Sequence, residues 1–172
     1  MEQIPKDYIE TAEDFFSFMS KEERSKMNKS FSDEQPILYH FFNHMINIIK
    51  DKDAREVGFD LYLTIYRSFK YYEVKIPTMT IENIMGITEK TGKLLMDNCD
   101  DSSTSNEIFI NLKKFMNQDE LMDHIHRKMF EMKDGNAILS TPEIWLDVFY
   151  EVMNVISILN DESKKHLTKE LN

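Results

Sequence analysis

The sequence contains few of the residues that end helices and form tight turns. Among its 172 residues there are 4 glycines and 4 prolines. Glycine supplies the positive backbone angles of tight hairpins and proline interrupts helices, so their scarcity disfavours a fold of many short strands. Helix-compatible residues such as Glu, Lys, Met, Leu and Ile dominate instead. We therefore predict an all-α fold.

Cysteine is almost absent. Cys99 is the only one, so no internal disulfide can form, which fits a reducing compartment. The first ten residues, MEQIPKDYIE, lack the positive leader and following apolar run of a secretion signal. No apolar run approaches the roughly 20 residues that cross a bilayer. We expect a cytoplasmic protein that does not enter a membrane.

Positive charge is in the minority. The chain has 21 Lys and Arg against 31 Asp and Glu, which gives a formal net charge of −10. Such a chain repels a phosphate backbone, and no stretch concentrates Lys or Arg into a positive surface, so we expect no nucleic-acid partner. The hydrophobic content of 41% is sufficient for a packed core at this length. We expect residues 1–172 to form a single helical domain.

Start and stop signals predict a compact bundle of about six to seven helices. Thr11 precedes an amphipathic run that predicts one helix over 12–28. Ser32 and Gln35 have the spacing of a capping box, which predicts that a second helix begins there and runs to about residue 51. Further helices are predicted at 54–72, 81–98, 107–116, 119–133 and from 142 onward.

Two of these segments share a pattern. EVGFDLYLTIY (56–66) and EIWLDVFYEVM (143–153) each carry an acid pair four residues apart among large apolar side chains. Positions four apart lie on one helix face, so each helix is apolar except for a narrow polar seam, as central helices of a bundle are. The seams hold Glu56, Asp60, Thr64 and Arg67 in the first helix and Glu143, Asp147, Glu151 and Asn154 in the second.

The segments before these two helices also resemble each other. QPILYHFFNHM from Gln35 aligns with DELMDHIHRKM from Asp119, which pairs His40 with His124. This resemblance favours a duplicated helical hairpin, with repeats at 32–72 and 117–160 connected through 77–106. Convergence is the alternative, because amphipathic helices of similar burial resemble one another without common descent.

No catalytic motif is found. There is no Gly-rich phosphate loop, no nucleophile elbow and no Cys-x-x-Cys. The Glu-x-x-His pairs of helical di-metal proteins are also missing, Asp123-x-x-His126 being the nearest match. The sequence therefore assigns no catalytic residue, and we expect no metal, no cofactor and no enzymatic activity.

Histidines and acids supply the candidate binding residues. His40 and His44 have the i, i+4 spacing of many metal sites, but no third ligand is evident and a solvated helix face explains them more simply. His124 lies on a polar helix face, whereas His126 lies at the edge of the apolar side. We interpret His126 as a buried, hydrogen-bonded histidine, with a ligand or a proton carrier as the alternative. If each hairpin contributes a histidine and an acid pair, a polar pocket forms between them. The candidates are His40, His44, Glu56, Asp60, His124, His126, Glu143 and Asp147.

Methionines and aromatic residues bear on binding to other proteins. The methionines at apolar helix positions predict core packing rather than a binding groove, and they are Met19, Met45, Met85, Met129 and Met153. Aromatic clusters such as DFFSF, YHFF and FKYY provide more bulky apolar surface than a small bundle hides. We therefore expect a protein partner or self-association.

These observations leave two functional hypotheses. The first is a cytoplasmic helical interaction or regulatory module that acts through helix surfaces, as a homodimer. The alternative is a helical enzyme or metal-binding protein with a polar His/Asp/Glu site between the two hairpins. The sequence does not indicate whether a small molecule binds.

Overall fold

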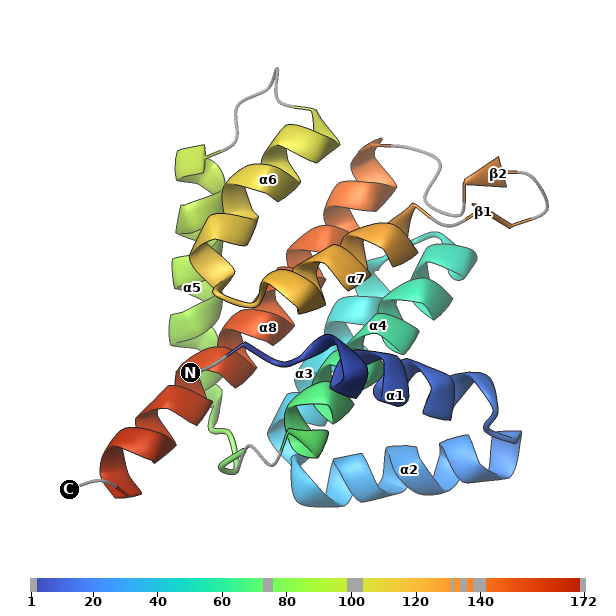
Figure 1. Ribbon diagram of the computed structural model, residues 1–172, viewed down its shortest axis with the longest axis vertical. Helices are drawn as coiled ribbons and strands as arrows, with labels where there is room; N and C mark the ends of the chain where they lie inside the picture. The colour runs from blue at the N-terminus through green and yellow to red at the C-terminus, as the bar shows by residue number, and fades with distance from the viewer. Residues whose placement is uncertain are drawn as a thin grey trace.

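The all-α prediction is confirmed, but the expected number of six to seven helices is too low. The computed structural model describes residues 3–72, 76–98, 104–130, 132–133, 136–137 and 142–170. These ranges contain eight helices (Figure 1): α1 (Lys6–Ser17), α2 (Lys21–Glu34), α3 (Pro36–Ile48), α4 (Lys52–Tyr71), α5 (Ile81–Asn98), α6 (Ser105–Met116), α7 (Asp119–Met129) and α8 (Pro142–Glu170). Two-residue strands, β1 (Met132–Lys133) and β2 (Asn136–Ala137), pair antiparallel before α8. None of the described helices is both long and apolar enough to span a membrane.

The additional helix arises near the N-terminus, where the predicted helix over 12–28 is wrong. The chain turns between α1 and α2, and Ser20 and Glu23 form a capping box that starts α2. The Ser20 backbone N–H donates to the Glu23 carboxylate at 2.8 Å, and the Glu23 N–H donates to the Ser20 hydroxyl at 3.3 Å. Such reciprocal bonds satisfy the free N–H groups of a helix start. Ser32, the predicted start of the next helix, lies inside α2, and α3 begins at Pro36, where the missing N–H does little harm.

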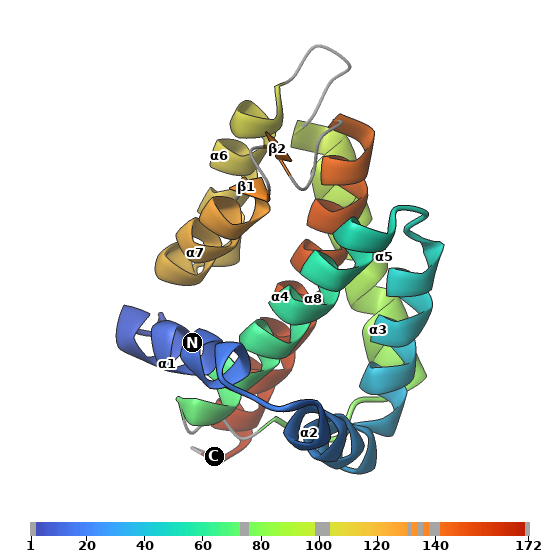
Figure 2. The same ribbon diagram turned by 90° about the vertical axis from the view of Figure 1, so that its right-hand side faces the viewer.

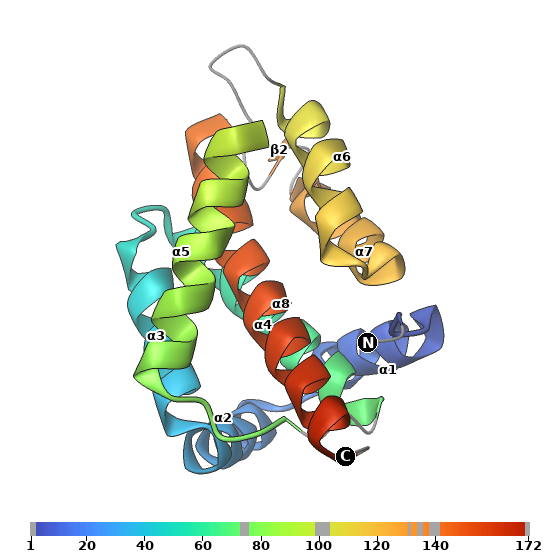
Figure 3. The ribbon, with the colours of Figure 1, turned by 90° about the vertical axis from the view of Figure 1, so that its left-hand side faces the viewer.

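The helices α4 and α8 cross at the centre of the molecule, as their apolar circumference predicts. They pack against each other, α1 packs on α4, and α5 packs on α8. The views in Figures 2 and 3 show α3 and α5 on one side of this pair and α1 and α7 on the other. Every residue at positions 61–66 of α4 and 151–156 of α8 is buried.

The polar seams of these central helices are only partly in contact with water. Glu56 and Asp60 are exposed at the N-terminal half of α4. Farther along each seam, Thr64, Glu151 and Asn154 are buried, with exposed fractions of 5%, 7% and 0%. The middle of each seam is therefore enclosed, because Thr64 lies among residues of α1 and α7 and Glu151 lies close to Tyr62 of α4.

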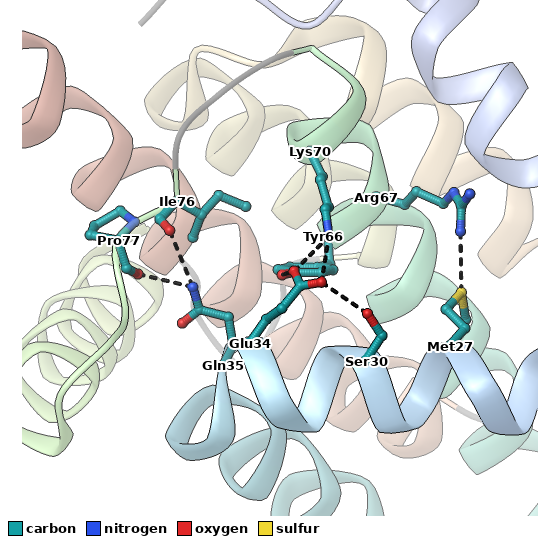
Figure 4. A network of polar contacts seen from close by, with 9 residues as sticks. All are labelled: Met27, Ser30, Glu34, Gln35, Tyr66, Arg67, Lys70, Ile76 and Pro77. Carbon is teal, nitrogen blue, oxygen red and sulfur yellow. Dashed lines mark hydrogen bonds and ion pairs between the residues drawn. The ribbon is translucent and has the colours of Figure 1, made fainter.

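Two buried glutamines tie the starts of α3 and α7 to segments far away in the sequence. Gln35 and Gln118 precede these helices with similar backbone angles, φ −135° and ψ 63° against φ −142° and ψ 60°. The Gln35 side-chain oxygen accepts from the Met79 N–H at 3.1 Å, and its amide donates to two carbonyls in the segment before α5 (Figure 4). The Gln118 oxygen accepts from the Ile4 N–H, before α1, at 2.9 Å. Each glutamine thus satisfies a buried backbone donor that would otherwise be costly.

Candidate functional site

A large hollow lies between α3 and α5, with Tyr150 of α8 at its floor. We call it the α3–α5 groove, and its volume is about 1000 Å³. Most of its surface is apolar, with a few charged groups among the residues that line it. Its lining residues are Ile37, His40, Phe41, Ile81, Ile84, Met85, Gly86, Thr88, Glu89, Gly92, Lys93, Met96, Asp97 and Tyr150.

The helix α5 makes this groove because it has two apolar sides. One side is buried against α8 and the rest of the core through Ile84, Ile87 and Thr91. The other side leaves large apolar side chains in water, and these are Ile81, Met85 and Met96, which are 57%, 66% and 82% exposed. The prediction that Met85 packs in the core is therefore wrong. The spacing of residues 81, 85, 88, 92 and 96 beside the stripe 84, 87 and 91 could have revealed this second apolar side.

Glycine keeps the middle of the groove hollow. A Cβ atom at Gly92 would lie 3.4 Å from the Tyr150 hydroxyl, so Tyr150 forms the floor at this point. A Cβ atom at Gly86 would meet nothing within 4 Å. Glycine within a helix costs roughly 1 kcal/mol relative to alanine. At Gly92 the missing side chain leaves the helix backbone and the Tyr150 hydroxyl at the surface of the groove.

A smaller and more polar cavity lies where α1 and α7 meet above α4. We call it the α1–α7 cavity, and its volume is about 220 Å³. Five charged or titratable side chains line it together with apolar neighbours. Its lining residues are Glu13, Phe16, Ser17, Arg24, Val57, Asp60, Leu61, Thr64, His124 and Lys128.

Charged groups from α1 and α7 close this cavity. Glu13 pairs with Lys128, and one of its oxygens lies 3.6 Å from His124 Nε2. On the other side of the ring, Arg127 Nη2 lies 3.0 Å from His124 Nδ1. Because a guanidinium only donates, Nδ1 acts as the acceptor, so a neutral His124 carries its proton on Nε2, facing Glu13.

Asp60 lies at the edge of the same cavity. Its Oδ1 is 3.4 Å from Arg24 Nη1, and Arg24 also donates to the Phe16 carbonyl at 3.0 Å. Although about half of the Asp60 side chain is exposed, at 53%, desolvation raises the pKa of this carboxyl. The charge of Arg24 opposes that rise and the charge of Glu56 adds to it.

The structure brings two of the candidate binding residues together. Asp60 and His124 both line the α1–α7 cavity. His124 was expected on a polar face, but it is only 6% exposed because α1 places Glu13 beside it. Its neighbours Arg127 and Lys128 are polar, as expected, but no local sequence signal could indicate the burial, since Glu13 comes from a distant helix.

The other candidates are dispersed. His40 is exposed and lines the α3–α5 groove, and His44 is exposed on the same helix. Glu56 is exposed and lies 3.9 Å from Lys52 in an ion pair within α4. The side chains of Glu143 and Asp147 lie outside the described residues. Within the described ranges, no group of three or more His, Cys, Asp or Glu is arranged to hold a metal ion.

His126 occupies an aromatic environment. Its ring is half-buried, with centroids 4.1 Å from Phe109 and 4.6 Å from Phe130. Its Nε2 atom is buried and makes no hydrogen bond with the described residues, so the prediction of a hydrogen-bonded histidine is wrong for this nitrogen. Desolvation lowers the pKa of His126, which keeps the ring neutral among its aromatic neighbours.

Comparison with protein-family models, curated proteins and solved structures finds no match for this chain. The function is therefore inferred from the geometry of the two sites described above.

Proposed function

We propose that this protein is an interaction module that acts through helix surfaces, with the α3–α5 groove as its binding surface. The observation that carries the proposal is the exposed apolar side of α5, where Ile81, Met85 and Met96 border a hollow of about 1000 Å³. Contiguous apolar patches of this kind mark interaction sites on soluble proteins. A groove between two helices is shaped to receive the apolar face of a third helix.

The occupant that we propose is α5 of a second copy of the chain, packed antiparallel. If the twofold axis passes between Thr88 and Glu89, Met85 of one copy lies over Gly92 of the partner subunit. Ile81 then lies opposite Met96 of the partner subunit. A flexible methionine side chain suits an irregular surface, and at Gly92 the partner helix has no side chain of its own, so that Met85 would pack beside the Tyr150 hydroxyl. The apolar side of α5 is thus complementary to itself, as a twofold interface requires.

Charge on one flank of α5 supports the same arrangement. At 100° per residue, Glu82, Glu89 and Lys93 lie on one edge of the apolar side. The antiparallel pairing brings Glu82 of each copy close to Lys93 of the partner subunit, which makes two attractive contacts. It also brings Glu89 of the two copies together at the twofold axis, which makes one repulsive contact. Such flanking charges set orientation and register in paired helices.

Sedimentation equilibrium tests this proposal. We expect wild-type protein to associate to twice the 20.5 kDa mass of the chain as concentration rises. The Met85→Glu variant should dimerise about 100-fold more weakly or not at all, because a carboxylate enters an apolar interface. The Glu89→Gln variant should dimerise more tightly, because the repulsion at the axis is removed.

The matched control is Phe18→Ser. Phe18 is 85% exposed and lies between α1 and α2, outside the groove. Its replacement should leave the dimer unchanged. A wild-type protein that stays monomeric at every concentration would contradict self-association, and equal weakening by Met85→Glu and Phe18→Ser would show that the groove is not the contact surface.

We also propose that the chain contains two copies of one four-helix unit, α1–α4 and α5–α8, which extends the predicted repeats at 32–72 and 117–160. The matching positions of Gln35 and Gln118 support it, since each receives a backbone N–H from the segment before the first helix of the other copy. The register between α3 and α7 is then 83 residues, which does not pair His40 with His124. Buried residues of α3 and α7 match in this register, Leu38, Phe42 and Ile46 with Leu121, Ile125 and Met129. In the first helices, α1 and α5, the register is 75 residues, and it matches Ile9, Ala12 and Phe16 with Ile84, Ile87 and Thr91.

A further inference from the structure

A third cavity lies between α2 and α4, away from both sites described above. We call it the α2–α4 cavity, and its volume is about 430 Å³. Figure 4 shows side chains of α2 and α4 that point toward each other in this region. Aromatic rings make up much of the lining, with a small group of charged residues. The lining residues are Phe16, Met27, Ser30, Phe31, Glu34, Leu63, Tyr66, Arg67, Lys70 and Tyr71.

The acid in this cavity is already fully paired. Lys70 Nζ lies 2.8 Å from Glu34 Oε1, the Ser30 hydroxyl donates to the same oxygen at 2.9 Å, and the Tyr66 hydroxyl donates to Oε2 at 3.2 Å (Figure 4). The hydrogen bond from Lys70 is the main cause that lowers the pKa of Glu34. Glu34 and Lys70 therefore cancel each other's charge and leave no anion for a second cation.

The second cation is Arg67, which is half-buried and held by aromatic rings. Its guanidinium carbon lies 3.2 Å from the Phe15 ring centroid and 4.7 Å from that of Tyr71. Nη1 donates to the Met27 sulfur at 3.3 Å, while Nε is buried and makes no hydrogen bond. In the described part of the chain, no ion pair joins Arg67 to a carboxylate. A partly desolvated charge of this kind is costly until an anion approaches.

We propose that the α2–α4 cavity binds a small monocarboxylate with an apolar body, such as a medium-chain alkyl acid, whose carboxylate pairs with Arg67. The charge balance of the lining is one positive charge, so a monoanion neutralises it. Phe31, Leu63 and the other apolar walls provide contact for the body of the ligand. The volume lies within the range of about 300–1,000 Å³ that is common for small-molecule sites.

The contacts of Arg67 with aromatic rings are compatible with ligand binding. The rings of Phe15 and Tyr71 lie against the guanidinium carbon, whereas the N–H donors lie in the guanidinium plane. A carboxylate binds in that plane, at the terminal nitrogens. Because the rings hold the guanidinium in one orientation, little side-chain freedom is lost when the anion binds.

Methyl NMR of protein labelled with ¹³C at its methionine methyl groups provides the test. The probes are octanoate and octan-1-ol, which have the same alkyl length but differ in charge. We expect octanoate to shift the Met27 methyl signal saturably, with a dissociation constant below about 1 mM, and octan-1-ol to bind at least about 10-fold more weakly. Met85 and Met96 report binding in the α3–α5 groove in the same spectra.

Three variants test the role of Arg67. Arg67→Met should weaken octanoate binding at least about 10-fold. Lys52→Met removes an exposed cation at the other end of α4 and should change nothing. Because Arg67 also contacts α1, Ser30→Phe provides an independent test that leaves the cation in place but fills the mouth of the cavity, and it should also abolish binding.

Several outcomes would overturn the proposal. Equal binding of octanoate and octan-1-ol would mean that charge is not recognised. Unchanged affinity in folded Arg67→Met, or shifts at Met85 and Met96 without one at Met27, would assign binding elsewhere. The result is independent of self-association, because Met85→Glu disrupts the proposed dimer without altering the lining of this cavity.

Discussion

The α1–α7 cavity and the α3–α5 groove are built in the same way but have opposite character. In the first, α1 lies on the central helix α4 and meets α7; in the second, α5 lies on the central helix α8 and faces α3. The ion pair of Glu13 with Lys128 and the contact of Glu13 with His124 draw the first pair of helices together around about 220 Å³. The second pair lacks such a link among its lining residues and leaves about 1000 Å³ open.

The difference shows that side chains determine whether two neighbouring helices are held together by contacts within the chain or leave a surface that a partner can bind. A charged bridge needs only one acid on α1 and two bases on α7. The part of α5 that lines the groove carries small or apolar groups such as Gly92 and Met85 beside the charged Glu89, Lys93 and Asp97. Removing an exposed apolar surface from water lowers the free energy. Because no other described part of the chain covers this surface of α5, a second chain can be stabilised by covering it.

The largest expected effect on stability is a difference between a buried residue of the α1–α7 cavity and an exposed residue of the α3–α5 groove. Leu61 lines the α1–α7 cavity and is 4% exposed, so Leu61→Ala should lower the free energy of unfolding by about 2–5 kcal/mol. Met85→Ala should change it by no more than about 0.5 kcal/mol in dilute, monomeric protein, because Met85 is 66% exposed. Urea denaturation measures both. Similar losses would mean that the groove is packed in solution and that the comparison fails.

Much of the fold could be predicted from sequence because it depends on local pattern. The scarcity of glycine and proline predicted helices, and the apolar circumference of residues 56–66 and 143–153 predicted the central pair. The break between α1 and α2 was missed because Ser20 and Glu23 lie inside a continuous amphipathic run, where a capping box competes with helix continuation. The burial of Thr64 and Glu151 was missed because the residues that cover them come from distant parts of the chain.

A second prediction concerns the two buried glutamines that precede α3 and α7. Gln35→Leu leaves the buried Met79 N–H without its acceptor, and Gln118→Leu does the same for Ile4, so each should cost about 1–3 kcal/mol of unfolding free energy. Gln3→Leu is the control, because Gln3 is exposed, and it should stay within about 0.5 kcal/mol. Losses that differ by much more than about 1 kcal/mol would argue against equivalent roles and weaken the proposed duplication.

The candidate sites were harder to predict than the fold, because cavities are made by residues from distant helices. The sequence selected Asp60 and His124 as candidates, but it could not indicate that Glu13 and Arg24 accompany them. The apolar side of α5 carries a visible pattern, yet Met85 was assigned to the core because exposed and buried methionines look alike in sequence. Arg67 was noted as part of a polar seam, and its aromatic neighbours come from α1 and from the next turn of α4.

The smallest expected effect tests the bridge that closes the α1–α7 cavity. Glu13→Gln keeps the shape of the side chain but removes the charge that faces Lys128 and His124, whose side chains are 27% and 5% exposed. We expect a loss of about 1–2 kcal/mol of unfolding free energy, because both groups lose a partly buried anionic partner. Glu10→Gln is the matched control on the same helix; Glu10 pairs with Lys6 in an exposed contact, so that change should stay below about 0.5 kcal/mol. If the two variants lose the same unfolding free energy, the ionic bridge does not hold α1 against α7. Burial of apolar side chains alone must then distinguish the α1–α7 cavity from the α3–α5 groove.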